Sequence, residues 1–113
     1  MEIKRDDVVL MVVPDELGRP RPGIIVQADA LGADTTTLLI CPLSSDLQTN
    51  PVPRLRPIVE PQAENGLRSR SQVMTDKMFA QRRDRIRRVI GTIDSDTRAR
   101  IDAALLLVLG LAD

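Results

Sequence analysis

The chain has 113 residues, enough for one hydrophobic core but too few for two, so we expect a single domain over residues 1–113. It carries 16 Lys and Arg against 16 Asp and Glu and no histidine, which removes the usual general base near neutral pH and the commonest zinc ligand. Its single aromatic residue, Phe79, leaves almost no surface for stacking nucleobases and argues against an RNA binder of the RRM type.

Charge is distributed unevenly along the chain. Residues 1–50 carry four Lys or Arg against eight Asp or Glu, residues 51–91 carry ten against four, and residues 92–113 carry two against four. A basic middle in a neutral chain fits docking onto a polyanion or onto an acidic protein segment.

The first half of the chain predicts three strands. Residues 7–13 form a β-branched run closed by Pro14, and the turn-forming segment 14–22 predicts a mobile loop. Strands at residues 23–29 and 37–43 follow, with a turn at residues 32–37 between them. These nearly continuous apolar runs suit a small closed barrel.

Cys41 lies within the third of these runs. A lone cysteine cannot form an internal disulfide, and the N-terminus shows no signal-peptide pattern, so we expect a cytoplasmic protein. In its apolar setting, Cys41 is interpreted as a small buried hydrophobic residue and not as a nucleophile.

The basic middle is harder to assign. Four prolines between Asp46 and Pro61 exclude a central strand and predict an edge strand or a long excursion in which Val52, Leu55 and Ile58 alternate. Asn65-Gly66 signals a turn, and residues 71–79 predict a strand. Its two faces would be Val73, Thr75, Lys77 and Phe79 on one side and Gln72, Met74, Asp76 and Met78 on the other.

Five arginines fall within residues 82–88, and their pattern fits either a solvated face paired locally with Asp84 or a binding surface. This segment predicts a short helix or turn that leads into a last strand at residues 88–93.

A C-terminal helix is the clearest predicted element. Asp94 or Ser95 would cap it, with Asp96 in its first turn. Its apolar stripe of Ile101, Ala104, Leu105 and Val108 is widened by Leu106, Leu107, Leu109 and Leu111 to most of the circumference, which predicts cover from a second subunit. The apolar run at residues 103–112 is about half of what a membrane crossing needs, so no membrane partner is expected.

Arg21 is the main candidate catalytic residue. Its guanidinium can make two parallel hydrogen bonds to phosphate oxygens, and Pro20 and Pro22 restrict the backbone on both sides of it. A loop arginine paired with Asp15 or Glu16 is the structural alternative.

Ser44 and Ser45 end the third predicted strand and are candidates to donate to the same phosphate. Alternation allows at most one of the two to do so, and capping of the next turn is their structural alternative. Such a site suits RNA cleavage through the ribose 2′-hydroxyl, which needs no metal or cofactor, and the carboxylates show no metal-ligand spacing. It requires Arg21 and Ser44 to lie on the same side of the molecule.

Six pieces of the chain, in order, resemble the MazF/PemK-type toxins of bacterial toxin–antitoxin pairs. They are KRDDVVLMVV, GRPRPGIIVQAD, ICPLSSD, NGLRSRSQVMTDKM, RRDRIRRVIGTID and the helix ending LLLVLGLAD. The resemblance implies a mainly β fold with α, an SH3-like small β-barrel with a C-terminal helix. It also implies a homodimer, metal-independent cleavage of single-stranded RNA, and neutralisation by a cognate antitoxin laid across the RNA groove.

By position, the resemblance assigns the catalytic arginine to Arg21 and the catalytic threonine to Ser44, which keeps the hydroxyl and loses the methyl group; Ser45 is the fallback. The candidate substrate-binding residues are Pro22, Arg54, Arg68, Gln72 and Lys77. Asp6-Asp7 stands where such toxins usually read Gly-Asp, a change expected to alter how the entry to the first strand turns.

Two other functions remain open at this point. CcdB-type toxins share the barrel and bind DNA gyrase, but they resemble one another in a tryptophan-containing tail, and this chain has no tryptophan. A barrel without activity that serves as a binding module is the second.

Overall fold

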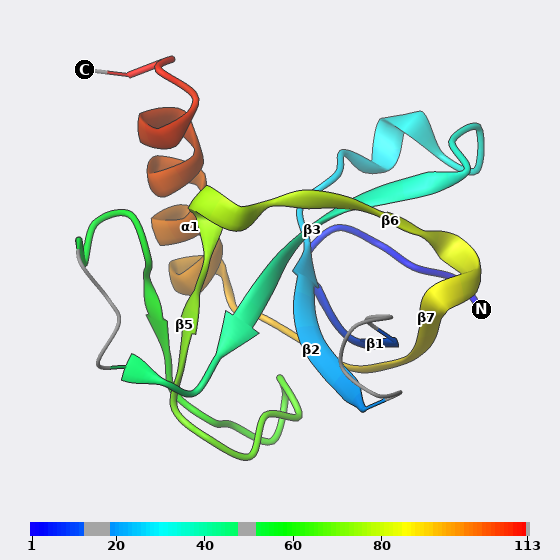
Figure 1. The fold of residues 1–113 in the computed structure, drawn as a ribbon, viewed down its shortest axis with the longest axis horizontal. Helices are drawn as coiled ribbons and strands as arrows, with labels where there is room; N and C mark the ends of the chain where they lie inside the picture. The colour runs from blue at the N-terminus through cyan, green and yellow to red at the C-terminus, as the bar shows by residue number, and fades with distance from the viewer. Residues whose placement is uncertain (13–18, 48–51, 113) are drawn as a thin grey trace.

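A computed structural model describes residues 1–12, 19–47 and 52–112, which fold into a curled antiparallel sheet with one α-helix (Figure 1). The strands are β1 (Asp7–Val12), β2 (Pro20–Ile25), β3 (Thr37–Ser44), β4 (Ile58–Val59), β5 (Ser71–Val73), β6 (Phe79–Arg82) and β7 (Ile86–Thr92). The helices are the 3-10 turns η2 (Asp29–Leu31), η4 (Thr75–Lys77) and η5 (Arg83–Arg85) and the helix α1 (Ser95–Val108).

β3 is the strand around which the sheet curls. The order is β4-β5-β3-β2-β1-β7, and β6 pairs with β3 beside this path. Residues Thr37 to Ile40 of β3 pair with β6, whereas Leu43 and Ser44 pair with β5. The resulting half-barrel with a C-terminal helix confirms the predicted fold class, mainly β with α.

Each side of the curled sheet buries its own apolar cluster. One cluster includes Val8, Ile24, Cys41, Val73 and Ile101, so α1 packs on that side. The other is composed of Val9, Met11, Ile25, Leu38, Ile40 and Ile86. Cys41 is fully buried, which confirms its interpretation as a small buried side chain, and this burial raises the pKa of its thiol to about 12.

The Asn65-Gly66 turn is present and is held from inside the molecule. The Asn65 Oδ1 atom accepts from the backbone N–H groups of Gln62 and Leu67, at 3.1 and 3.0 Å. Gly66 has a φ of 69°, and a Cβ there would lie 2.2 Å from the carbonyl oxygen of Ile90. Only glycine fits this turn against β7.

The second strand begins earlier than predicted. β2 starts at Pro20, so Arg21 is part of the strand and not of a loop before it. At Pro20 and Pro22, β2 pairs with β1, but its pairing with β3 stops at Gly23. One edge of β2 is therefore unpaired at these positions, and a proline, which has no N–H to donate, is tolerated at such an edge. The predicted loop at residues 14–22 lies mostly outside the described residues, as do Asp15 and Glu16.

The predicted strand at residues 71–79 is wrong as a single element. β5 ends at Val73, η4 interrupts the chain, and β6 begins at Phe79. The break lets the chain follow β3 past its bend, and the buried Thr75 hydroxyl donates to the carbonyl oxygen of Leu55 at that point.

In the described part of the proline-rich excursion, the two-residue edge strand β4 is the only strand, and it pairs with β5. The predicted alternation of Val52, Leu55 and Ile58 is wrong, because Val52 is exposed while Arg56 is buried. Residues 48–51 of this segment lie outside the described part of the chain.

α1 has the predicted cap, since the Asp94 carboxylate accepts from the backbone N–H of Thr97 at 2.8 Å. Ile101 and Ala104 are buried as predicted, whereas Val108 of the predicted stripe is exposed. Leu106, Leu109 and Leu111 are also exposed, so α1 packs on the sheet through its N-terminal turns, whereas its C-terminal end is exposed.

Asp6 takes over the turn that precedes β1. Its φ is 76°, in the left-handed region that favours glycine and that aspartate tolerates better than most residues. Its carboxylate lies 3.2 Å from the Arg98 guanidinium on α1 and 3.8 Å from that of Arg5. The aspartate therefore adopts a turn conformation that favours glycine, and its carboxylate pairs with the helix.

Candidate active site

A groove of about 1270 Å³ opens at the end of the half-barrel. Its walls come from β1, β2, β3 and β7, from the segment 66–71, and from residues in and beside η4. The groove exists because β2 and β3 separate beyond their last pair, Gly23 with Pro42, after which β3 turns to pair with β5.

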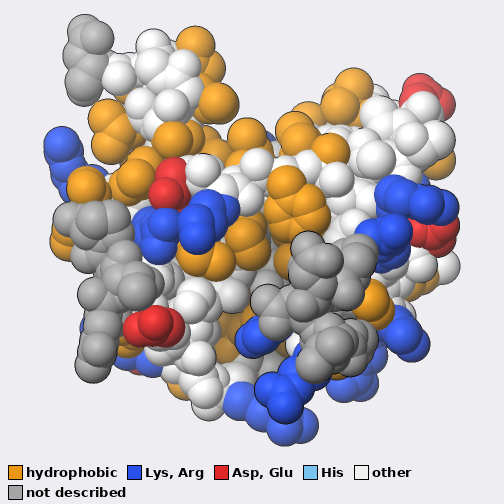
Figure 2. All heavy atoms as spheres, in the orientation of Figure 1, with side chains coloured by type: hydrophobic (Ala, Val, Ile, Leu, Met, Phe, Trp, Pro, Cys, Tyr) orange, Lys and Arg blue, Asp and Glu red, His pale blue; other side chains and the backbone are white. Residues whose placement is uncertain are grey.

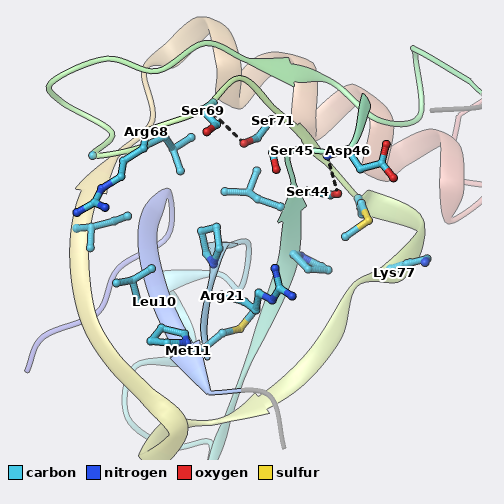
Figure 3. A pocket seen from close by; sticks show the side chains of 18 of the residues that line it. Leu10, Met11, Arg21, Ser44, Ser45, Asp46, Arg68, Ser69, Ser71 and Lys77 are labelled. Carbon is cyan, nitrogen blue, oxygen red and sulfur yellow. Dashed lines mark hydrogen bonds between the residues drawn. The ribbon is translucent and has the colours of Figure 1, made fainter. Parts of the chain in front are cut away.

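Arg21 and Ser44 face each other across this separation. Each lies two residues beyond the pair Gly23–Pro42, so side-chain alternation places both on the face that this pair shares. Both line the groove, and Figure 3 shows Arg21 extending from β2 on the side that faces the end of β3. Arg21 and Ser44 therefore lie on the same side of the molecule, as a shared phosphate site requires.

The Ser44 hydroxyl is held by the turn that follows β3. Its Oγ atom accepts from the backbone N–H of Asp46 at 3.1 Å (Figure 3). A hydroxyl that accepts one bond still has its own hydrogen to donate. Ser45 lines the groove from beyond the end of β3, so both serines contribute to the same surface.

The groove is cationic. Four basic side chains line it, from Arg21, Arg68, Lys77 and Arg88, against a single carboxylate among the described residues, that of Asp46. Within the described residues, neither Arg68 nor Arg88 forms an ion pair. Concave positive surfaces of this kind raise the local concentration of polyanions.

The groove wraps around the end of β2 and so has two sides. Leu10 pairs with Pro22 on β2 and with Arg88 on β7, so these three residues share the face opposite to Arg21. In Figure 3, Arg68 lies across the groove from Arg21, beside β7, whereas Lys77 extends away at the far edge. Pro22, Arg68 and Lys77 thus line the groove with Arg21 and Ser44.

Two of the candidate substrate-binding residues do not line the groove. Arg54 lies in an exposed turn before β4. Gln72 is fully buried, with 0% of its surface exposed, and its side-chain amide donates to a backbone carbonyl. Alternation had grouped Gln72 with Met74, Asp76 and Met78 on one face and did not predict that its side chain would be buried.

The arginine-rich segment divides between structural and surface positions. Arg83 donates to the carbonyl oxygens of Thr35 and Gly32, at 2.6 and 2.8 Å, and so holds the turn before β3. Arg82 pairs with Asp84 at 2.6 Å on the surface. Of the five arginines, only Arg88 lines the groove.

Sequence reasoning missed a buried ion pair behind the groove. The Arg56 guanidinium donates to both carboxylate oxygens of Asp76, each at 2.9 Å, and only 7% of its side chain is exposed. This hydrogen bonding lowers the pKa of the Asp76 carboxyl and raises that of Arg56. The pair ties the excursion before β4 to η4, where Met74 and Lys77 border the groove.

No three Cys, Asp or Glu side chains within residues 1–12, 19–47 and 52–112 cluster closely enough to hold a metal ion. In the same part of the chain, every helix is too short or too polar to span a lipid bilayer.

Comparisons with known proteins agree on one family. Residues 4–109 match the family of PemK-like, MazF-like toxins of type II toxin–antitoxin systems. A protein of Mycolicibacterium smegmatis named probable endoribonuclease MazF is 33% identical over 95 residues, which cover 84% of each chain.

Solved structures share the fold. A mycobacterial endoribonuclease in complex with its cognate antitoxin superposes with a TM-score of 0.80 at 19% identity over 99% of each chain. The Mycobacterium tuberculosis toxin MazF-mt6 gives a TM-score of 0.77 at 17% identity over 95% of this chain and 99% of its own.

Proposed function

This chain belongs to the PemK-like, MazF-like family of toxins of type II toxin–antitoxin systems and is a toxin endoribonuclease, and we propose that it cleaves single-stranded RNA in the groove between β2 and β3. The observation that carries this assignment of the site is the position of Arg21 opposite Ser44 on one face of the separating strands. A cationic groove around them gives the polyanionic substrate a path to the pair.

The proposed reaction uses the substrate as its own nucleophile. The ribose 2′-hydroxyl oxygen bonds to phosphorus, the bond from phosphorus to O5′ breaks, and one proton passes overall from O2′ to O5′. Arg21 would hold two phosphate oxygens and stabilise the additional negative charge, and the Ser44 hydroxyl would donate to the same phosphate. Positioning and charge stabilisation can supply this rate enhancement without a metal ion.

A homodimer is part of the proposal. Leu106 in the last turn of α1 and Leu109 and Leu111 just beyond its end are exposed, and Figure 2 shows apolar side chains gathered there. A second copy that covers these residues would bury apolar surface that one subunit leaves in water. The family also implies a cognate antitoxin, whose acidic segment would compete with RNA for the groove with salt-sensitive affinity.

The proposed location is the cytoplasm. The single cysteine is buried and free, which suits a reducing compartment, and cytoplasmic RNA is the substrate that the site would meet there.

The decisive experiment measures cleavage of a single-stranded RNA by purified protein in EDTA. We expect cutting to persist in EDTA and Arg21→Ala to lower the rate at least about 100-fold without changing the melting temperature, because a transition-state donor is lost. Arg21→Lys keeps the charge but loses the fork and should recover little activity. Arg19→Ala removes a neighbouring exposed arginine outside the groove lining and serves as the matched control.

Three results would contradict this mechanism: a requirement for Mg²⁺, full activity in Arg21→Ala, or an equal loss in Arg19→Ala. A gyrase poison would leave RNA intact and trap cleaved DNA with gyrase. A barrel acting only as a binding module would do neither.

A further inference from the structure

Gln72 occupies an unusual place for an amide. It lies in the centre of β5, paired with Ser44 of β3 on one side and Ile58 of β4 on the other, and it is fully buried. Burying an amide in an apolar setting costs free energy unless the amide is hydrogen-bonded, and an apolar side chain would fill the space more easily. The free energy of this buried amide therefore depends on its hydrogen-bond contacts.

Those contacts lead to the candidate active site. The Gln72 Nε2 atom donates to the carbonyl oxygen of Asp46 at 2.7 Å. The backbone N–H of the same Asp46 donates to Ser44 Oγ at 3.1 Å. One residue, Asp46, therefore receives the buried amide on its carbonyl side and holds the Ser44 hydroxyl on its N–H side.

The arrangement fixes the Ser44 hydroxyl in two ways. The ladder pair Ser44–Gln72 holds the backbone of Ser44, and the side chain of Gln72 holds the turn that follows it. Serine lacks the methyl group that restricts a threonine rotamer, so its hydroxyl direction depends more on such bonds. With Oγ accepting from Asp46, the hydroxyl hydrogen is left to point to another acceptor.

We propose that Gln72 is a positioning residue for RNA cleavage, which acts through the turn at Asp46 on the Ser44 hydroxyl and does not contact the substrate. This inference rests on the proposed function, because it assigns Ser44 to the reacting phosphate. A small displacement of a reacting group lowers the rate by one or two orders of magnitude with little change in substrate affinity.

The test is a double-mutant cycle on the full-length protein with single-stranded RNA. Gln72→Met keeps the length and removes the donor, and we expect kcat to fall about 10- to 100-fold while KM changes less than about threefold. In the Ser44→Ala background, Gln72→Met should lower kcat no further.

Thr75→Val is the matched control. It removes another buried side-chain bond to a backbone carbonyl, from the same stretch of chain, but that bond goes to Leu55 and not to the turn after Ser44. We expect it to lower the melting temperature and to leave kcat within about threefold of the unmodified protein.

Amide hydrogen exchange gives a readout that is independent of activity. The Asp46 N–H should exchange at least about tenfold faster in Gln72→Met, because the turn that holds it has lost its anchor.

If Gln72→Met does not fold, Asp46→Pro compared with Asp46→Ala tests the other half of the chain of bonds. Both lose the carboxylate, but only proline removes the N–H that holds Ser44. Because Asp46 lines the groove, Asp46→Ala is the reference for loss of its carboxylate, and we expect the kcat of Asp46→Pro to fall by a further factor of about 10 to 100, as expected for Gln72→Met.

Some outcomes would overturn the proposal. An equal effect of Gln72→Met with and without Ser44, a rise in KM without a fall in kcat, or an equal loss of kcat in Thr75→Val would each do so. Full activity of Ser44→Ala would refute the role of Ser44 itself, and that failure is recognised in the single variant.

Discussion

The groove and the upper turns of α1 are both exposed, but their surfaces differ in kind. The groove is lined by Arg21, Arg68, Lys77 and Arg88 against one described carboxylate, whereas α1 exposes leucines at its end. In the view of Figure 2, apolar side chains surround the upper part of the helix, and many Lys and Arg side chains lie along the lower edge of the molecule. A polyanion and a second copy of the chain are therefore expected at separate places.

The two surfaces also differ in how their exposure affects the stability of a single subunit. Solvent-exposed arginines destabilise a folded subunit little, because water solvates their charge. Clustered in a groove, they attract phosphate groups. Exposed leucines are not stabilised by contact with water, and together they form an apolar patch that association with a second subunit can bury. Substitutions should therefore separate the two surfaces: one kind of change affects RNA cleavage, and the other affects assembly.

The largest effect is expected at α1. Leu109 is 54% exposed in the single subunit, so Leu109→Asp should leave the subunit folded but convert a dimer to a monomer, because an interface would bury an unpaired carboxylate. Sedimentation equilibrium at micromolar concentration measures this. Leu31→Asp, at a leucine 48% exposed on η2, is the control and should leave the dimer intact. A monomeric unmodified protein would end the proposal of a shared helix.

A smaller effect is expected on the groove side. Arg88 lines the groove and Arg87, its neighbour in β7, does not. Arg88→Ala should raise the KM for RNA several-fold and reduce its dependence on salt concentration, with kcat nearly unchanged, because one phosphate contact is lost. Arg87→Ala should change neither quantity. Equal effects of the two variants would mean that diffuse surface charge, and not the groove, binds RNA.

The smallest effect concerns a buried arginine, which contrasts with those in the groove. Arg56 lowers the pKa of the Asp76 carboxyl in the folded state. The contribution of this pair to the free energy of unfolding is therefore complete above the ordinary carboxyl pKa near 4 and is lost as pH falls through the lowered pKa. The free energy of unfolding should therefore drop below about pH 4 through this pair and not between pH 5 and 7.

Asp76→Asn should remove this part of the acid dependence. Urea unfolding measured across pH 2–7 should show a flatter curve and, at neutral pH, a loss of about 2 kcal/mol, because Arg56 is left buried without its charged partner. An unchanged acid limb would show that other carboxylates dominate it.

Several features could be predicted because a local cause determines them. Asp94 caps α1 and Asn65-Gly66 forms a turn, since both depend on the residue's own side chain or backbone freedom. The placement of Arg21 and Ser44 on the same side of the molecule could also be predicted from sequence, because the two residues stand at adjacent ends of two neighbouring strands with known side-chain alternation.

Other features could not be predicted, because the partner is distant in sequence. The buried position of Gln72 depends on the carbonyl of Asp46, 26 residues away, and the buried Arg56 depends on Asp76, 20 residues away. Polar residues without a visible partner are assigned to the surface, and that rule fails when the fold supplies the partner. The interruption of residues 71–79 by η4 has the same origin, since it follows the bend of β3.

The sequence by itself determined the class of this protein: a small barrel with a capped apolar helix, a buried cysteine, and an arginine held between prolines before a buried run. Only the tertiary structure decided which polar residues serve the groove and which support it from inside. The physical reason is that hydrophobic patterning and turn chemistry act over a few residues, whereas the burial of an amide or a guanidinium is settled by the hydrogen-bond partner that folding brings to it.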